Sequence, residues 1–212
     1  MLPAPPAEIL VLAGVNGAGK SSIAGAALVR RGGACYNPDV ATREYGLAGL
    51  SPADANSRAW HRGRAQLERA ITSGSSYAFE TTLGGRSITQ LLIEAATAGH
   101  RVRIWYVGLS SPELHVQRVR DRVAKGGHNI PEARIRSRWT SSRENLIRLL
   151  PHIAELALHD NSVEARPDAG EPPRPRRILY ARTGVIQAVA PPGEVPDWSK
   201  PVVMAALKEW YR

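Results

Sequence analysis

Residues 14–21 combine glycine, lysine and serine at the spacing G-x-x-x-x-G-K-[ST], without a mismatch. The glycines allow successive backbone N–H groups to turn inward around a phosphate. Lys20 would then contact the β- and γ-phosphates of a nucleoside triphosphate, and the Ser21 hydroxyl would ligate Mg²⁺. We therefore predict an ATP site whose contacts are Gly14, Val15, Asn16, Gly17, Ala18, Gly19, Lys20, Ser21 and Ser22.

The flanks of this glycine-rich segment have the composition that a phosphate-binding loop needs. Residues 8–13 are an apolar run of strand length, and residues 22–31 have helical composition. Strand, glycine loop and helix is the order in which such a loop binds phosphate, with the helix N-terminus adding a favourable dipole. A glycine-rich turn that matches by chance is the alternative, and the flanks argue against it.

Polar clusters follow three predicted strands, at residues 37–39, 80–82 and 160–162. In open α/β sheets, ligands bind beyond the carboxyl ends of the strands. Phosphoryl transfer needs a carboxylate that orients the attacking hydroxyl and accepts its proton, and Asp39 is our first candidate. A helix cap is the alternative role for Asp39. Glu80 is expected to contact acceptor hydroxyls or a magnesium-bound water, with a solvated strand-end charge as its alternative.

Cationic side chains cluster on both sides of a Gly-Gly-His sequence at residues 126–128, namely Arg118, Arg122, Lys125, Arg134 and Arg138. The first three are spaced i, i+4, i+7 and the last two i, i+4, so each set shares one helix face. Mobile arginines often neutralise the charge that develops on a transferred phosphoryl group. We predict that Arg118 and Arg122 are catalytic and that residues 118–138 form a lid; ordinary surface charge is the alternative.

Composition limits the classes of function. The chain has 212 residues, a hydrophobic fraction of 43% and a net charge of +9. No apolar run approaches the roughly 18 residues that span a bilayer, so no membrane partner is expected. The N-terminus lacks a secretory pattern and the single Cys35 cannot form an internal disulfide, which together favour the cytoplasm. The positive charge invites nucleic-acid binding, but no aromatic–basic interleaving or zinc pattern supports it.

Apolar runs alternate with helical stretches, which predicts an α/β fold with a parallel five-stranded sheet flanked by helices. The predicted strands are residues 8–13, 34–36, 77–79, 102–107 and 155–159. Predicted helices include residues 51–73, 87–98, 111–124 and 131–150. We expect a core over residues 1–164. Residues 165–212 would add a Pro-rich connector, a small hairpin (178–182 and 185–189) and a short helix, packed on the core.

The order of these motifs resembles the zeta toxins, and most closely the small stand-alone zeta-toxin-like kinases. The resemblance is carried by the glycine loop, residues 37–39, Phe79-Glu80-Thr81-Thr82-Leu83, the two arginines before the Gly-Gly-His sequence, and residues 160–162. It covers roughly residues 8–162. The resemblance implies a P-loop kinase fold that uses ATP and Mg²⁺, with Lys20 on the phosphates and Asp39 as base. Arg122 matches the family's arginine, and Arg118 is the alternative match.

The acceptor that this resemblance implies is a sugar hydroxyl of a nucleotide sugar such as UDP-N-acetylglucosamine, and the partner protein would be an antitoxin. Substrate contacts are expected from the side chains Glu80, Thr81, Thr82, Arg86 and His128. A nucleoside, NAD or an antibiotic is the alternative acceptor. A nucleotide-dependent regulatory module without catalysis is the alternative from another class, and a carboxylate at Asp39 argues against it.

Overall fold

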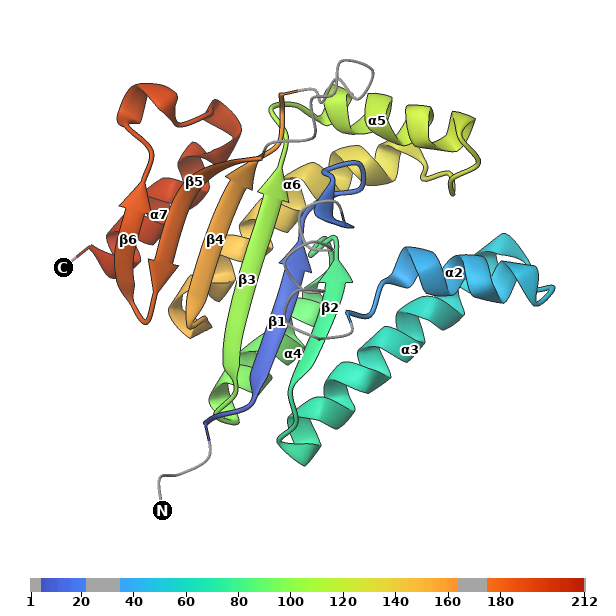
Figure 1. The fold of residues 1–212 in the computed structure, drawn as a ribbon, viewed down its shortest axis with the longest axis horizontal. Helices are drawn as coiled ribbons and strands as arrows, with labels where there is room; N and C mark the ends of the chain where they lie inside the picture. The colour runs from blue at the N-terminus through green and yellow to red at the C-terminus, as the bar shows by residue number, and fades with distance from the viewer. Residues whose placement is uncertain (1–4, 22–34, 164–174, 212) are drawn as a thin grey trace.

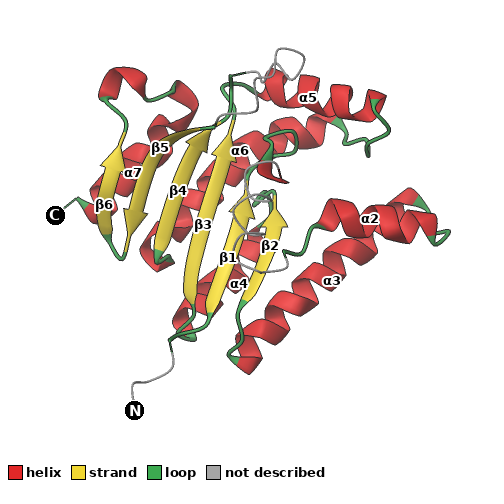
Figure 2. Cartoon of the chain, viewed as in Figure 1, coloured by secondary structure: helices red, strands yellow, loops and turns green. Residues whose placement is uncertain are grey.

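The computed structural model describes residues 5–21, 35–163 and 175–211 (Figure 1). Its strands are β1 (Glu8–Ala13), β2 (Tyr77–Thr81), β3 (Arg101–Gly108), β4 (Glu155–Asp160), β5 (Arg176–Arg182) and β6 (Val185–Val189). Its α-helices are α2 (Pro38–Leu47), α3 (Pro52–Ser73), α4 (Arg86–Thr97), α5 (Pro112–Ala124), α6 (Glu132–Leu149) and α7 (Lys200–Trp210). Figure 2 colours the same view by secondary structure. The helix predicted at 22–31 and most of the predicted connector lie outside the described residues.

The strands form one sheet in the order β2-β1-β3-β4-β5-β6. The first four run parallel, as predicted, whereas β5 pairs antiparallel with β4 and β6 antiparallel with β5. The predicted hairpin is therefore present, but it extends the main sheet, and the sheet is mixed rather than purely parallel. The tight turn at Thr183-Gly184, where both residues have positive φ, reverses the chain between β5 and β6.

The strand predicted at residues 34–36 is not a full strand in the described part of the chain. Tyr36 makes an isolated parallel bridge to Phe79, donating its N–H to Ala78 and accepting from Glu80. The reason lies in the next residues, because Asn37 caps α2 and Pro38 occupies its first turn. Proline there suits a helix start and cannot donate to a ladder. The chain therefore leaves the sheet edge after one residue.

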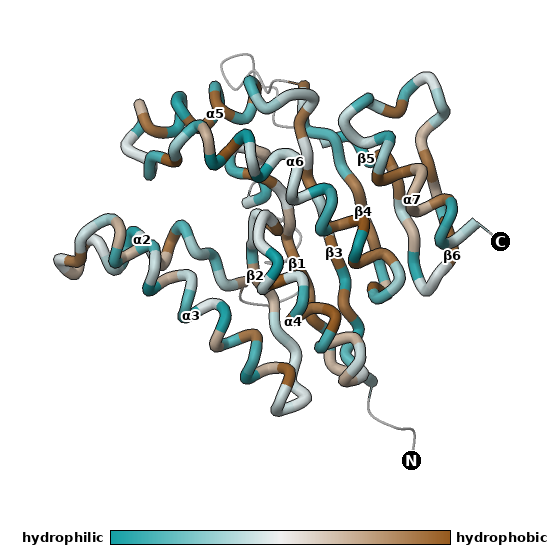
Figure 3. Tube along the Cα trace, turned by 180° about the vertical axis from the view of Figure 1, so that it is seen from behind, coloured by the Kyte–Doolittle hydropathy of each residue, from teal (hydrophilic) through white to brown (hydrophobic). Residues whose placement is uncertain are grey.

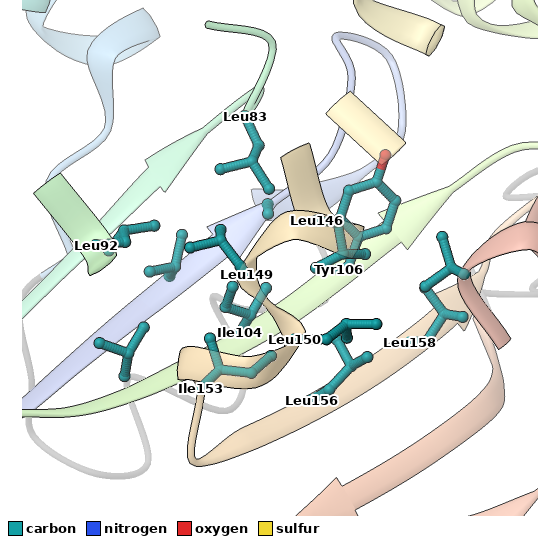
Figure 4. Packing of buried hydrophobic residues seen from close by; sticks show 14 of the residues in the cluster. Leu83, Leu92, Ile104, Tyr106, Leu146, Leu149, Leu150, Ile153, Leu156 and Leu158 are labelled. Atoms are coloured by element: carbon teal, nitrogen blue, oxygen red, sulfur yellow. The ribbon is translucent and has the colours of Figure 1, made fainter. Parts of the chain in front are cut away.

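One face of the sheet is covered by α4, α6 and α7, which lie behind the strands in Figure 1 and in front of them in Figure 3. Figure 3 also draws much of the central strands in the brown of hydrophobic residues. Ile104, Tyr106 and Leu156 of the sheet pack there with Leu146 and Leu149 of α6 (Figure 4). Burial of these side chains supplies the main favourable term in folding.

Helix starts agree closely with the sequence patterns. Ser51 caps α3 by accepting the N–H of Asp54, and Ser111 caps α5 by accepting the N–H of Leu114. Proline follows each cap, at the first helical position that tolerates it. These caps fix where α3 and α5 begin. No described helix has the length and apolarity needed to cross a bilayer.

Candidate active site

The phosphate loop (residues 14–21) leaves the carboxyl end of β1 and turns by means of glycines with positive φ. Gly14 has a φ of 143° and Gly17 one of 84°. A Cβ atom on Gly14 would collide with the carbonyl of Val107, and one on Gly17 would lie 2.7 Å from the carbonyl of His115. Glycine is thus required at both positions by conformation and by space. Ser22, predicted as part of this loop, lies outside the described residues.

Lys20 folds back over the loop that it belongs to. Its Nζ donates to the carbonyl oxygen of Gly14 at 2.8 Å. Burial lowers the pKa of Lys20, while the negative charges of Glu80 and Asp39 act in the opposite direction. A buried ammonium at the centre of a glycine loop is matched by an anion, and a phosphate has the charge and the acceptor oxygens for that place.

Ser21 and Glu80 form an oxygen-rich group at the end of β2. The Ser21 hydroxyl donates to the Glu80 carboxylate, at 3.0 Å from Oε1. Glu80 is only 9% exposed. Burial raises the pKa of Glu80, opposed by the charge of Lys20 and the hydrogen bond from Ser21. Hydroxyl and carboxylate oxygens are ligands that Mg²⁺ prefers, so the residues present fit this cation beside a phosphate.

Asp39 lies in the first turn of α2 and does not cap it. Asn37 is the cap, because its Oδ1 accepts the N–H of Asp39 at 2.8 Å and that of Val40 at 3.4 Å. The Asp39 carboxylate is instead paired with Arg122 of α5, at 2.9 Å between Oδ2 and Nη1. The side chains of this pair are 46% and 37% exposed. Two residues that sequence reasoning predicted as catalytic therefore touch each other.

The predicted lid residues occupy different places around the site. Arg122 bridges Asp39 and the carbonyl of His128, with 3.0 Å to the latter. Arg118 lies within 3.5 Å of the carbonyl of Val163. Arg138 of α6 donates to the Asn16 side chain of the phosphate loop at 2.8 Å. Burial lowers the pKa of Arg138, with the charge of Arg134 as a second cause.

Two side chains form hydrogen bonds with backbone carbonyls of the phosphate loop. His115 of α5 contacts the carbonyl of Asn16 through Nδ1 at 2.9 Å, and Asn161 donates to the carbonyl of Ala18 at 2.9 Å. Because a carbonyl only accepts, the first bond requires the proton on Nδ1. Burial lowers the pKa of His115 to about 4. The sequence placed Asn161 in a strand-end cluster, but it gave no signal for His115.

A cavity of about 250 Å³ joins the parts predicted to do chemistry. Arg138 of the predicted lid lines it, and so do six of the predicted ATP-binding, catalytic and substrate-binding residues: Asn16, Lys20, Asp39, Glu80, Thr81 and Thr82. A second cavity, of about 770 Å³, lies between α2 and α5 and is lined by Arg118, Arg122 and His128. Asp39 lines both cavities. Arg86, the first residue of α4, is exposed and lines neither, although its neighbours Gly85 and Ser87 line the first.

The first cavity also has a wall that sequence reasoning did not assign to the site. Asn56, Trp60 and Arg64 of α3 line it, together with Tyr36. The spacing of Trp60, Leu67 and Ile71 in the sequence predicts that they share one side of this helix. In the structure Leu67 is buried, whereas Trp60 lies at the cavity. The signal available was the i, i+4, i+8 spacing of Asn56, Trp60 and Arg64 on one helix face.

The sheet, the phosphate loop and the helices around them define an α/β fold similar to that of P-loop kinases. Residues 9–146 match the family model described as an AAA domain, and the chain belongs to this family. A zeta-toxin assignment stays a prediction, because the family model that matches is the AAA domain.

Solved structures share this fold at low sequence identity. The AvrRxo1-ORF1:-ORF2 complex crystallised with ATP contains a chain that superposes with a TM-score of 0.64 at 18% identity, over 95% of this chain and 64% of that one. A structure of the PezAT chromosomal toxin–antitoxin system of Streptococcus pneumoniae gives a TM-score of 0.57 at 12% identity, over 98% of this chain and 87% of that one. Such identities show the fold alone.

A sequence relative covers less of the chain. An uncharacterised protein of Haemophilus influenzae is 34% identical over 70 residues, which are 33% of this chain and 50% of that protein. This chain therefore matches half the length of that relative, and it spans less than two thirds of the AvrRxo1 chain above.

Proposed function

We propose that this protein is an ATP-dependent kinase that transfers the γ-phosphate to a hydroxyl of a small molecule. A nucleotide sugar such as UDP-N-acetylglucosamine is our first candidate acceptor, as in the zeta toxins. The observation that carries the proposal is the meeting of Lys20, Glu80 and Asp39 around one cavity. A phosphate-binding lysine and two carboxylates at one place suit transfer to a hydroxyl better than nucleotide binding alone.

Residues that line the cavity can assist the proton transfer and the phosphoryl transfer. The acceptor hydroxyl gives its proton to the Asp39 carboxylate while its oxygen bonds to the γ-phosphorus. The bond from that phosphorus to the β-phosphate oxygen breaks, and ADP leaves. Lys20 stabilises the charge that develops on the phosphoryl oxygens. Mg²⁺, when bound, neutralises phosphate charge, and Ser21 with Glu80 would hold it.

The Asp39–Arg122 ion pair sets the order of events in this proposal. While Arg122 Nη1 donates to Oδ2 of Asp39 at 2.9 Å, that oxygen is not available to an acceptor hydroxyl. Arg122 would turn from Asp39 to the phosphates when ATP binds, which frees the carboxylate for the acceptor proton. Arg118 would be the second cation of the lid, and Thr81, Thr82, Arg86 and His128 would contact the acceptor.

The decisive experiment offers the protein ATP·Mg²⁺ with a panel of nucleotide sugars, nucleosides, NAD and antibiotics. Mass spectrometry then detects an acceptor that has gained one phosphoryl group. The Lys20→Ala variant is the matched control for contaminating kinases. If the phosphorylated acceptor is not a nucleotide sugar, the acceptor class proposed above is wrong while the kinase activity stands. Hydrolysis of ATP without any phosphorylated acceptor would instead support a regulatory module.

A partner protein is a further part of the proposal. The AvrRxo1 and PezAT structures named above are, by their titles, a two-protein complex and a toxin–antitoxin system. We propose an antitoxin-like partner for this chain by that analogy of fold. Co-expression with the product of a neighbouring gene, followed by size-exclusion chromatography, tests it; a product that never co-elutes with this chain argues against that partner.

A further inference from the structure

The wall of the first cavity that lies away from the phosphate loop is one face of α3. Asn56, Trp60, Gly63 and Arg64 line the cavity at spacings that place them on the same side of the helix. In Figure 1 the C-terminal end of α3 lies next to the start of β2. The other end of β2 contains Glu80, which lines the same cavity. A molecule with its hydroxyl near Asp39 and Lys20 would therefore extend its remaining part along this wall.

Trp60 is the large apolar surface of that wall. Its side chain is 39% exposed, whereas the other four tryptophans of the described structure are buried or half-buried. Arg64 lies above the indole, with 5.7 Å from its guanidinium carbon to the ring centroid, and Glu68 holds Arg64 by an ion pair at 2.8 Å. The His61 ring packs edge-on against the same indole, with 4.8 Å between the ring centroids. The part of the indole that stays exposed at the cavity, which Asn16 and Lys20 also line, is a stacking surface for a flat ring.

The neighbouring aromatic residue is fixed rather than adaptable. The Tyr36 hydroxyl donates to the carbonyl of Ala59 at 2.5 Å. A Cβ atom on Gly63 would lie 2.6 Å from the Tyr36 ring, so the glycine lets this ring rest against the backbone of α3. Burial raises the pKa of Tyr36, which keeps the hydroxyl protonated as a donor. The wall is thus preorganised, and preorganisation lowers the entropic cost of binding.

Asn56 adds a polar edge one helical turn before Trp60. Within the described chain, no hydrogen bond engages its amide, although it lines the cavity. An amide offers a donor and an acceptor side by side, which matches the hydrogen-bonding edge of a nucleobase. We propose that this wall binds the heterocyclic base of the acceptor, with the ring stacked on Trp60 and its edge on Asn56. The inference rests on the proposed function, since it takes this cavity as the acceptor site.

Equilibrium binding tests the base site without requiring catalysis. The probes are uridine, adenosine, UDP-N-acetylglucosamine and the base-free N-acetylglucosamine 1-phosphate, measured by equilibrium dialysis against the protein and its variants. Trp60→Ala should weaken the base-carrying probes about 5- to 150-fold, the equivalent of about 1–3 kcal/mol per stacked base. Trp60→Phe should recover most of this loss. Arg69→Ala, at an exposed position of the same helix outside the cavity lining, is the matched control and should bind as the wild type.

Several outcomes would overturn the base site. Binding of no base-carrying probe to the unsubstituted protein would remove it, as would an unchanged affinity in Trp60→Ala. An equal loss for the base-free probe would show that Trp60 holds the sugar instead. If Trp60→Ala weakens the binding of ATP alone, the Trp60 ring stacks on the adenine of ATP and not on the acceptor. Base-dependent binding without any phosphorylated product would keep the base site and refute the proposed kinase function.

Discussion

The substitution Asp39→Asn separates a catalytic carboxylate from a structural one. Asparagine keeps the size of the side chain and an oxygen that accepts from Arg122, but it cannot take up the acceptor proton. The helix cap is untouched, because Asn37 supplies it. We therefore expect a large loss of phosphoryl transfer with little loss of stability.

The magnitudes follow from where the side chain lies. The Asp39–Arg122 pair is well exposed, at 46% and 37%, and exposed pairs contribute about 0.2–1 kcal/mol. Loss of a negative charge from the first turn of α2 adds about 0.3–1 kcal/mol. For a chain of this length, each 1 kcal/mol lowers Tm by about 2–4 °C. Removing a general base costs about 10²–10⁴-fold in rate, or roughly 3–5 kcal/mol of activation free energy.

The assay compares thermal unfolding, ATP affinity and phosphorylated product for wild type, Asp39→Asn and Asp121→Asn. Asp121 is a suitable control, since it lines the second cavity on α5 but not the first. We expect Asp39→Asn to lose product formation at least 10²-fold, to melt within about 8 °C of wild type and to bind ATP normally. Wild-type product formation would refute the base assignment. A much larger fall in Tm would make Asp39 a structural residue.

Lys20→Ala should lower turnover by orders of magnitude while the protein stays folded, measured by ADP release and circular dichroism; near-normal turnover would mean that the loop does not bind ATP as proposed. Arg118→Ala and Arg122→Ala should each lower kcat by about 10²–10³-fold with a smaller change in ATP affinity. Arg120 pairs with Glu132, so Arg120→Ala is the control and should leave kcat unchanged. Equal kcat values in all three variants would mean that Arg118 and Arg122 are ordinary surface charges. Because the folded pKa of His115 is about 4 and the ordinary value is about 6.5, only the unfolded chain takes up this proton between those values. Stability from this group should be complete above pH 6.5 and fall by about 3 kcal/mol towards pH 4, so His115→Gln should flatten the pH dependence of urea unfolding; an unchanged pH profile would count against a neutral buried imidazole.

Local patterns predicted the elements well where one short segment contains all the determinants. Ser51-Pro52 and Ser111-Pro112 mark the starts of α3 and α5, because capping is decided within four residues. Two predictions differ from the structure for another reason: residues 35–36 contribute one bridge rather than a full strand, and the sheet is mixed rather than parallel throughout. Whether Tyr36 continues as a strand depends on Pro38, and whether β5 joins the sheet depends on the free edge of β4.

The sequence by itself determined the phosphate loop, since its glycines, Lys20 and Ser21 lie within eight consecutive residues and their conformations follow from residue type. Only the tertiary structure decided what surrounds that loop. Asp39 meets Arg122 across 83 positions of sequence, and Asn16 meets Arg138 across 122. Such contacts depend on how α2, α5 and α6 pack around the sheet, and no local spacing encodes that packing. For the same reason Trp60 could be placed on a helix face from sequence, but only the fold turned that face toward the cavity.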